Sequence, residues 1–253
     1  MKRCAGWWLV LLLAGPLAHA QDADAPRTEV GLSTERSDLD RGYADWTEHS
    51  LRVQRHHGAR DFSAFALTRT SRFGLDDTQF ELTHERALSP AWVAGLSLTV
   101  SPTHRVLPRT GLAGRLQYEF APAWLLHLGA RHTRYRSSEV DRLDLGLERY
   151  VGDFSHALRW SPVRALGRSE QVLEWRSHWY PAEGRSLGLI VAAGDEATEL
   201  GAGNIALARV RSLALVARWR LDDAWTLTGS LSRTRQGDFY VRTGVGAGVQ
   251  RRF

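Results

Sequence analysis

The chain has 253 residues and a formal net charge of +5 at pH 7, and this length suits one medium domain or one barrel. The charge is too small to indicate a protein that binds nucleic acid. The single cysteine is Cys4, so the chain from Gln21 onward can use neither disulfides nor thiol catalysis.

Residues 1–20 have the layout of a secretory signal peptide. Lys2 and Arg3 precede an apolar run from Trp7 to Ala14, and Ala18-His19-Ala20 forms a small-x-small tripeptide. We expect cleavage after this tripeptide, which leaves residues 21–26 as a short periplasmic N-terminus. The alternative is a short N-terminal membrane anchor, but the apolar run is too short to span a bilayer.

From about Arg27 to Phe253, apolar and polar residues alternate in short runs. The last segment places Val241, Thr243, Val245, Ala247, Val249 and Phe253 on one face, with Gly244, Gly246, Gly248, Gln250 and Arg252 on the other. A period of two predicts strands, and no later apolar run is long enough for a transmembrane helix. We therefore predict one all-β domain over residues 27–253.

The expected strands are joined by two kinds of connection. Three tight turns precede Trp92, Trp124 and Trp225, and three more lie near residues 57–60, 151–154 and 181–184. Seven longer, more polar loops are expected near residues 37–45, 73–77, 102–108, 136–141, 164–169, 195–206 and 236–238. Short turns at one end and longer loops at the other are typical of outer-membrane barrels. The pattern predicts a closed antiparallel transmembrane β-barrel of fourteen strands, or of twelve if one hairpin is divided in error.

A soluble β-sandwich is the competing architecture, because its strands alternate in the same way. The barrel is favoured because the polar face carries many glycines and charges of both signs, which suits a polar lumen. Tryptophans beside turns also fit an aromatic girdle at a membrane interface. In addition, Phe253 closes an amphipathic strand, although Arg251 stands where an apolar residue is usual.

These features predict an outer-membrane location. The expected partners are outer-membrane lipids, including lipopolysaccharide, and the barrel-assembly machinery, which would read the strand ending at Phe253. The chain has no lysine after Lys2, so its basic side chains are arginines, whose planar guanidinium groups suit lipid phosphates. Codon usage in a GC-rich genome explains the same bias without any function.

Three segments give the chain a family likeness. They are Asp45-Trp46-Thr47-Glu48-His49, the run from Arg72 to Gln79, and the run from Glu148 to Phe154. In this order and spacing the chain resembles the YaiO family of outer-membrane β-barrel proteins, over roughly residues 28–253. The resemblance implies an outer-membrane barrel, and it carries over neither a substrate nor catalytic residues.

Candidate catalytic and metal sites are weak. The histidine–serine neighbours are His49-Ser50 and Ser155-His156. Neighbours in a strand point to opposite faces, so neither pair forms a nucleophile–base hydrogen bond unaided. The acidic loop residues, which could bind calcium but more simply remain solvated, are Asp38, Asp40, Asp45, Asp76 and Asp77. We predict no catalytic residue, metal site or cofactor.

Charged residues on the expected lumen face are the remaining candidates. They are Glu81, Glu85, Arg115, Glu119, Arg131, Asp144, Glu148, Arg159, Glu174, Arg176 and Arg218. They could line a pore for polar solutes, or pair with one another to prop or plug the barrel. The leading hypothesis is a non-enzymatic outer-membrane barrel, acting as a channel or as a surface component of an envelope or polysaccharide system. The alternative is a lipid-modifying acyl hydrolase or transferase with a Ser/His site.

Overall fold

The computed structural model describes residues 26–136, 138–199 and 205–253 as a barrel of fourteen strands. The predicted signal peptide (1–20) lies outside these residues, as does the predicted periplasmic segment except for Pro26. In chain order the strands are β1 Arg27–Leu39, β2 Trp46–Gly58, β3 Asp61–Arg72, β4 Leu75–Ala87, β5 Trp92–Val100, β6 Thr110–Ala121, β7 Trp124–Arg134, β8 Glu139–Val151, β9 Phe154–Ala165, β10 Arg168–Ala182, β11 Arg185–Glu199, β12 Ile205–Arg220, β13 Trp225–Gln236 and β14 Tyr240–Arg252. Among the described residues, no helix is long and apolar enough to cross a membrane.

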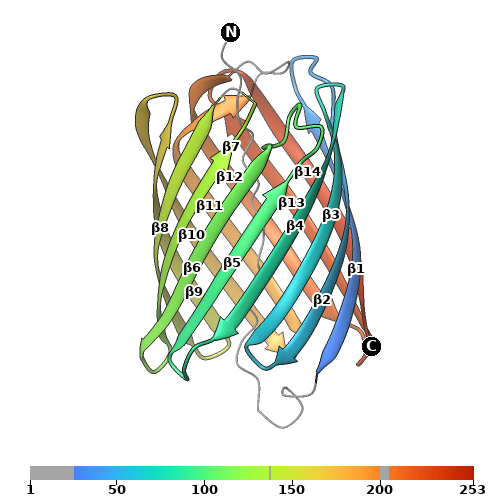
Figure 1. Ribbon diagram of the computed structural model, residues 1–253, viewed down its shortest axis with the longest axis vertical. Coiled ribbons are helices and arrows are strands. Elements are labelled where there is room, and N and C mark those ends of the chain that lie inside the picture. The colour runs from blue at the N-terminus through green and yellow to red at the C-terminus, as the bar shows by residue number, and fades with distance from the viewer. Residues whose placement is uncertain (1–25, 137, 200–204) are drawn as a thin grey trace.

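The sheet closes on itself. Each strand pairs antiparallel with its neighbours in the chain, and β1 pairs with β14, where Leu32 lies opposite Val249. The strands wrap around the barrel with a steep tilt (Figure 1). Closure leaves no sheet edge with unpaired N–H and C=O groups, which is the condition for strands to lie in lipid. The prediction of a closed antiparallel barrel with fourteen strands is confirmed.

Alternate residues of each strand face different surroundings. On β8, Leu143, Leu145 and Leu147 are 43–54% exposed on the outer face, whereas the alternating Arg142 and Asp144 face the lumen and are more covered. Exposed leucines outside and charged groups inside are the reverse of a soluble domain. The same reversal recurs around the barrel, so its outer surface is an apolar band.

The two ends of the barrel differ in their connections. We call the end that holds the six predicted tight turns the turn end, and the opposite end the loop end; β1 begins and β14 finishes at the turn end (Figure 1). Two of the seven expected long loops are instead two-residue turns, because Arg72 pairs with Leu75 and Ala165 with Arg168. The linking residues 73–74 and 166–167 all have positive φ, between 51° and 75°, as in the primed turns that suit twisted hairpins.

An aromatic belt surrounds the outer face near the turn end. Trp124 and Trp225, which follow predicted turns, begin β7 and β13 there, and Trp219 lies near the end of β12. The guanidinium carbon of Arg149 lies 4.8 Å from the ring centre of Trp124, and that of Arg251 lies 5.3 Å from Trp225. Stacked arginine keeps its charge while covering an aromatic face, so Arg251 fits this belt despite the sequence expectation of an apolar residue.

Candidate functional site

The lumen wall is the candidate site, and its most connected part lies on β8, β9 and β10. Arg142 Nε lies 2.7 Å from Asp144 Oδ1, and its terminal nitrogen donates to Ser161 Oγ at 2.7 Å. Ser161 Oγ in turn donates to Asp144 Oδ1 at 2.6 Å. The closed triangle joins β8 to β9 and holds the Oδ1 atom of the predicted Asp144 on the wall.

A second group on this wall centres on Glu174, which is only 4% exposed. Arg176, two residues along β10, donates from Nε to Glu174 Oε1 at 2.5 Å. Arg159 lies directly opposite Glu174 on β9, with 3.8 Å between its guanidinium and the same oxygen. The structure therefore brings three of the predicted residues into one cluster with two positive charges and one negative charge.

Glu148 begins a third group, toward the turn end. Its Oε2 lies 2.9 Å from His127 Nε2 on β7. Ser155 on β9 is 1% exposed, and its hydroxyl lies 3.3 Å from the Tyr180 hydroxyl. These side chains extend the polar wall from β7 to β10.

The wall formed by β4, β5 and β6 holds an ion pair that spans a strand. Glu85 on β4, Gly95 on β5 and Arg115 on β6 lie in one row. Arg115 forms an ion pair with Glu85 across the middle strand. A Cβ placed on Gly95 would lie 2.6 Å from Arg115 Nε, so the pair depends on the absence of a side chain at residue 95.

Three predicted lumen residues lie outside these clusters. Glu81 accepts a hydrogen bond from Thr83 Oγ1 at 3.1 Å on the same strand. Within the described ranges, neither Glu119 nor Arg131 has an ion pair, and Arg131 lies opposite Arg142. These two side chains therefore carry charge on the wall without an ion-pair partner in the described part of the chain.

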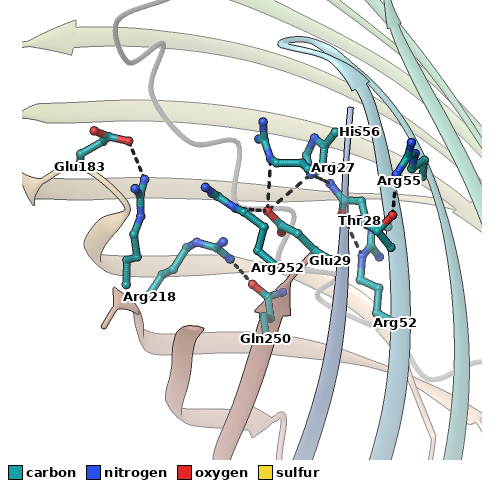
Figure 2. A network of polar contacts seen from close by, with 12 residues as sticks. Arg27, Thr28, Glu29, Arg52, Arg55, His56, Glu183, Arg218, Gln250 and Arg252 are labelled. Atoms are coloured by element: carbon teal, nitrogen blue, oxygen red, sulfur yellow. Dashed lines mark hydrogen bonds and ion pairs between the residues drawn. The ribbon is translucent and has the colours of Figure 1, made fainter. Parts of the chain in front are cut away.

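A further group at the turn end of the lumen was only partly predicted (Figure 2). Arg27 and Glu29 on β1, His56 on β2 and Arg252 on β14 converge there, and Arg218 on β12 lies beside them. Of this group, the alternation of residues predicted Arg218 as a lumen residue and Arg252 on the polar face. The convergence itself depends on the pairing of the first and last strands, which alternation alone does not disclose.

At the loop end, the connection between β5 and β6 folds onto the inner face of the barrel wall. Residues 101–109 fold back so that Leu107 is 1% exposed, and Asp77 Oδ2 accepts hydrogen bonds from Val106 N at 2.6 Å and Leu107 N at 2.7 Å. Asp77 itself is 2% exposed, so its predicted role as a solvated loop acid was wrong. Asp77 lies on the face of β4 that points into the barrel, and its carboxylate anchors this loop.

Aromatic side chains pack together on the inner face at the same end of the barrel. Trp46 lies 5.2 Å from Phe73 between ring centres, and Tyr43 lies 5.4 Å from Tyr240. Arg242 places its guanidinium carbon 4.9 Å from the Trp46 ring centre. Trp46 and Tyr240 are 8% and 2% exposed, so this cluster is a packed core inside the barrel mouth.

The two histidine–serine neighbours diverge as expected for adjacent strand residues. His49 lies on the outer face, with Nδ1 3.0 Å from Thr34 Oγ1, whereas Ser50 bonds Thr68 at 3.1 Å on the inner face. His156 is exposed outside, whereas Ser155 is buried inside. In the part of the chain that the structure describes, no group of three or more His, Cys, Asp or Glu side chains could hold a metal ion.

The apolar outer band and the charged inner wall define a membrane β-barrel with a porin-like fold. The model of the YaiO membrane beta barrel domain matches residues 27–195, and the chain belongs to this family. The resemblance inferred from the sequence is confirmed.

Solved porins and channels share the fold. The CymD monoaromatic hydrocarbon channel has a TM-score of 0.60 at 10% identity, covering 90% of this chain and 88% of that chain. Omp33 of Acinetobacter baumannii has a TM-score of 0.55 at 9% identity, covering 90% and 99%. The KdgM porin has a TM-score of 0.50 at 12% identity, covering 88% and 98%. At such identities the likeness concerns the fold alone, and no curated protein sequence matches the chain.

Proposed function

We propose that the chain is a non-enzymatic outer-membrane channel for small polar solutes. The proposal rests on one observation, which is the position of the ion-pair partners of the charged lumen residues. The ion pairs of Asp144, Glu148, Glu174 and Glu85 join side chains on one strand, on adjacent strands or across a single intervening strand. Charges paired along the wall leave the middle of a wide barrel to water, whereas a plug needs side chains that meet across it.

The proposed location is the outer membrane, with the turn end in the periplasm and the loop end outside the cell. Tight turns at one end and the folded-back segment 101–109 at the other support this orientation. The fold shared with outer-membrane porins supports the location.

Single-channel recording on refolded protein in a planar bilayer tests the proposal. Discrete current steps that scale with salt concentration are expected. A barrel that shows heat-modifiable mobility on a gel, and so is folded, but that gives no steps would contradict the channel.

Outer-membrane lipids, including lipopolysaccharide, are the proposed partners of the outer face near the loop end. Arg211 on β12 lies directly opposite Arg235 on β13, with Arg209 and Arg233 two residues away along the same strands. All four are exposed; Arg209 lies 3.8 Å from Asp195 and Arg235 lies 3.4 Å from Asp238, whereas Arg211 and Arg233 have no ion pair among the described residues. The directly opposed charges of Arg211 and Arg235 disfavour one another. Phosphates of an outer-leaflet glycolipid would relieve this repulsion while its acyl chains cover the apolar band.

Lipid A binding by native mass spectrometry tests this partner. The double variant Arg211→Gln/Arg233→Gln is expected to lose its preference for bisphosphorylated over dephosphorylated lipid A. Arg69→Gln/Arg134→Gln is the matched control, because those arginines lie 3.9 Å from Asp76 and 2.9 Å from Glu139 rather than beside other arginines. Equal losses in the two variants would count against a site at this cluster.

A lipid-modifying enzyme is the second candidate, and one observation favours it. A hollow of about 620 Å³ is lined by the outward-facing Leu32, Leu51 and Leu67, with Thr34 and His49 at its polar edge. The Thr34–His49 pair could act on an ester held there. Mass spectra of lipid A and phospholipids from cells expressing wild type or Thr34→Ala decide this, since identical spectra exclude that chemistry.

A further inference from the structure

The turn-end group carries more positive charge than its acidic partner can neutralise. We call Arg27, Arg218, Arg252, His56 and Glu29 the cationic basin (Figure 2). They come from β1, β2, β12 and β14, so they line one side of the lumen at the turn end. Three arginines face one carboxylate, and Arg220 beside them is paired separately with Glu183 at 2.6 Å.

The contacts of Glu29 show how loosely the basin is paired. The carboxylate oxygen lies 3.6 Å from Arg27 Nε, 3.6 Å from Arg252 Nε and 3.8 Å from His56 Nε2. These separations exceed ordinary hydrogen-bond length, so Glu29 shares its charge without forming a close pair. Arg27 Nε is buried and has no hydrogen-bond partner among the described residues.

Arg218 adds a positive charge held by a neutral partner. Its terminal nitrogen donates to Gln250 Oε1 at 2.6 Å, which fixes the guanidinium without neutralising it. Arg27, Glu29 and His56 side chains are 24%, 14% and 13% exposed, so the basin is partly removed from water. Partly buried charges act on a solute more strongly than charges on an open surface.

We infer that the cationic basin is an anion-binding site that makes the proposed channel select small solutes carrying carboxylate or phosphate groups. Guanidinium groups offer paired N–H donors that match both kinds of oxyanion. Rings of arginine or lysine serve this purpose in anion and phosphate pores. The inference rests on the proposed channel, because the basin lies on its solute path.

Reversal potentials in a dilute KCl gradient test the inference. Wild type is expected to favour chloride over potassium, and Arg218→Gln/Arg252→Gln to lower that permeability ratio by roughly threefold or more. The preference should fade toward 1 M salt, where the screening length is about 3 Å. A wild-type ratio near unity in dilute salt would overturn the inference even though current steps show a channel.

Two single substitutions separate charge at the basin from charge elsewhere. Gln250→Glu leaves every arginine in place but gives Arg218 an acidic partner, so it should lower the ratio as Arg218→Gln does. Arg131→Gln is the matched control, because it removes one arginine from the lumen face outside the basin. A shift with Arg131→Gln as large as that with Arg218→Gln would refute the assignment to the basin.

A binding measurement keeps the inference testable if no current is seen. Calorimetry with tripolyphosphate, on folded barrels in a zwitterionic detergent, should show binding by wild type. Arg218→Gln/Arg252→Gln should weaken that binding by roughly tenfold, and Arg131→Gln should leave it near wild type. If current alone is absent, the proposed channel is contradicted. If wild type does not bind tripolyphosphate, the assignment of the cationic basin as an anion-binding site is contradicted.

Discussion

The two ends of the lumen are held together by different kinds of side-chain contact. At the loop end, Trp46 and Tyr240 pack with neighbouring aromatic rings, and Asp77 holds the folded-back segment 101–109. At the turn end, Arg27 and Arg252 share Glu29 at long range. In the proposed channel, we expect the apolar, close-packed end to limit the size of a solute and the charged, loosely paired end to act on its sign. Size and charge selection are thus expected to be separable by mutation.

Removing Trp46 should have the largest effect on the loop end. Trp46→Ala deletes a buried ring that contacts Phe73 and Tyr240, and a change of this kind costs about 3–5 kcal/mol of unfolding free energy. Unfolding in urea, followed by gel mobility in detergent micelles, measures it. Trp46→Phe keeps a ring and should lose much less, and ion selectivity should change in neither variant. A loss below about 1 kcal/mol would mean that the cluster is not a packed core.

Releasing the folded-back loop comes next. Asp77→Ala leaves Val106 N and Leu107 N without their acceptor, at a cost of about 2–3 kcal/mol, and should raise single-channel conductance by widening the loop end. Asp76→Ala is the matched control. The side chain of Asp76, next to Asp77 in the chain, faces outward, is 59% exposed and lies 3.9 Å from Arg69. Equal conductance in the two variants would show that the loop does not limit the path.

A smaller loss of unfolding free energy is expected from a substitution midway between the two ends of the lumen. Gly95→Ala places a methyl group 2.6 Å from Arg115 Nε and should displace Arg115 from Glu85, with a loss of about 1 kcal/mol. Gly114→Ala is the matched control, since a Cβ there meets no atom within 4 Å. Equal unfolding free energies for the two variants would contradict the bridging geometry.

The smallest effect concerns pH at the turn end. The hydrogen bond from Arg220 holds the pKa of the Glu183 carboxyl below its ordinary value. A depressed pKa keeps the pair charged until the pH falls through that lowered value, and the contribution of the pair is lost below it. Protonation then frees the positive charge of Arg220, so chloride preference should rise slightly in acid. Glu183→Gln should remove the contribution of Glu183 to this rise, and an unchanged pH profile in the variant would contradict its role.

Much of the fold was open to prediction because strand alternation is a local property. The period of two along β14 placed Val245 outside and Gly244 inside, and tight turns before Trp92, Trp124 and Trp225 counted hairpins correctly. The lengths of two loops were mistaken, because polar residues beside Phe73 and Leu166 continue the strands rather than widening the turns.

The lumen site was predictable in composition but not in partnership. Alternation was enough to propose Glu174, Arg159 and Arg176 for one face of neighbouring strands, and the structure joins them. Arg131 and Glu119 met the same criterion, yet no ion pair reaches them within the described ranges. Which charges meet depends on strand register, since a shift of one residue changes every cross-strand neighbour.

By itself, the sequence determined the strands and which residues share a face, because backbone pleating sends successive side chains to opposite sides. Only the tertiary structure decided that Glu29 would meet Arg252, since β1 and β14 become neighbours through closure of the whole sheet. It also decided that Asp77 would hold a distant loop and that Gly95 would let Arg115 cross to Glu85. These contacts join residues far apart in the chain, and their geometry exists only once the barrel is closed.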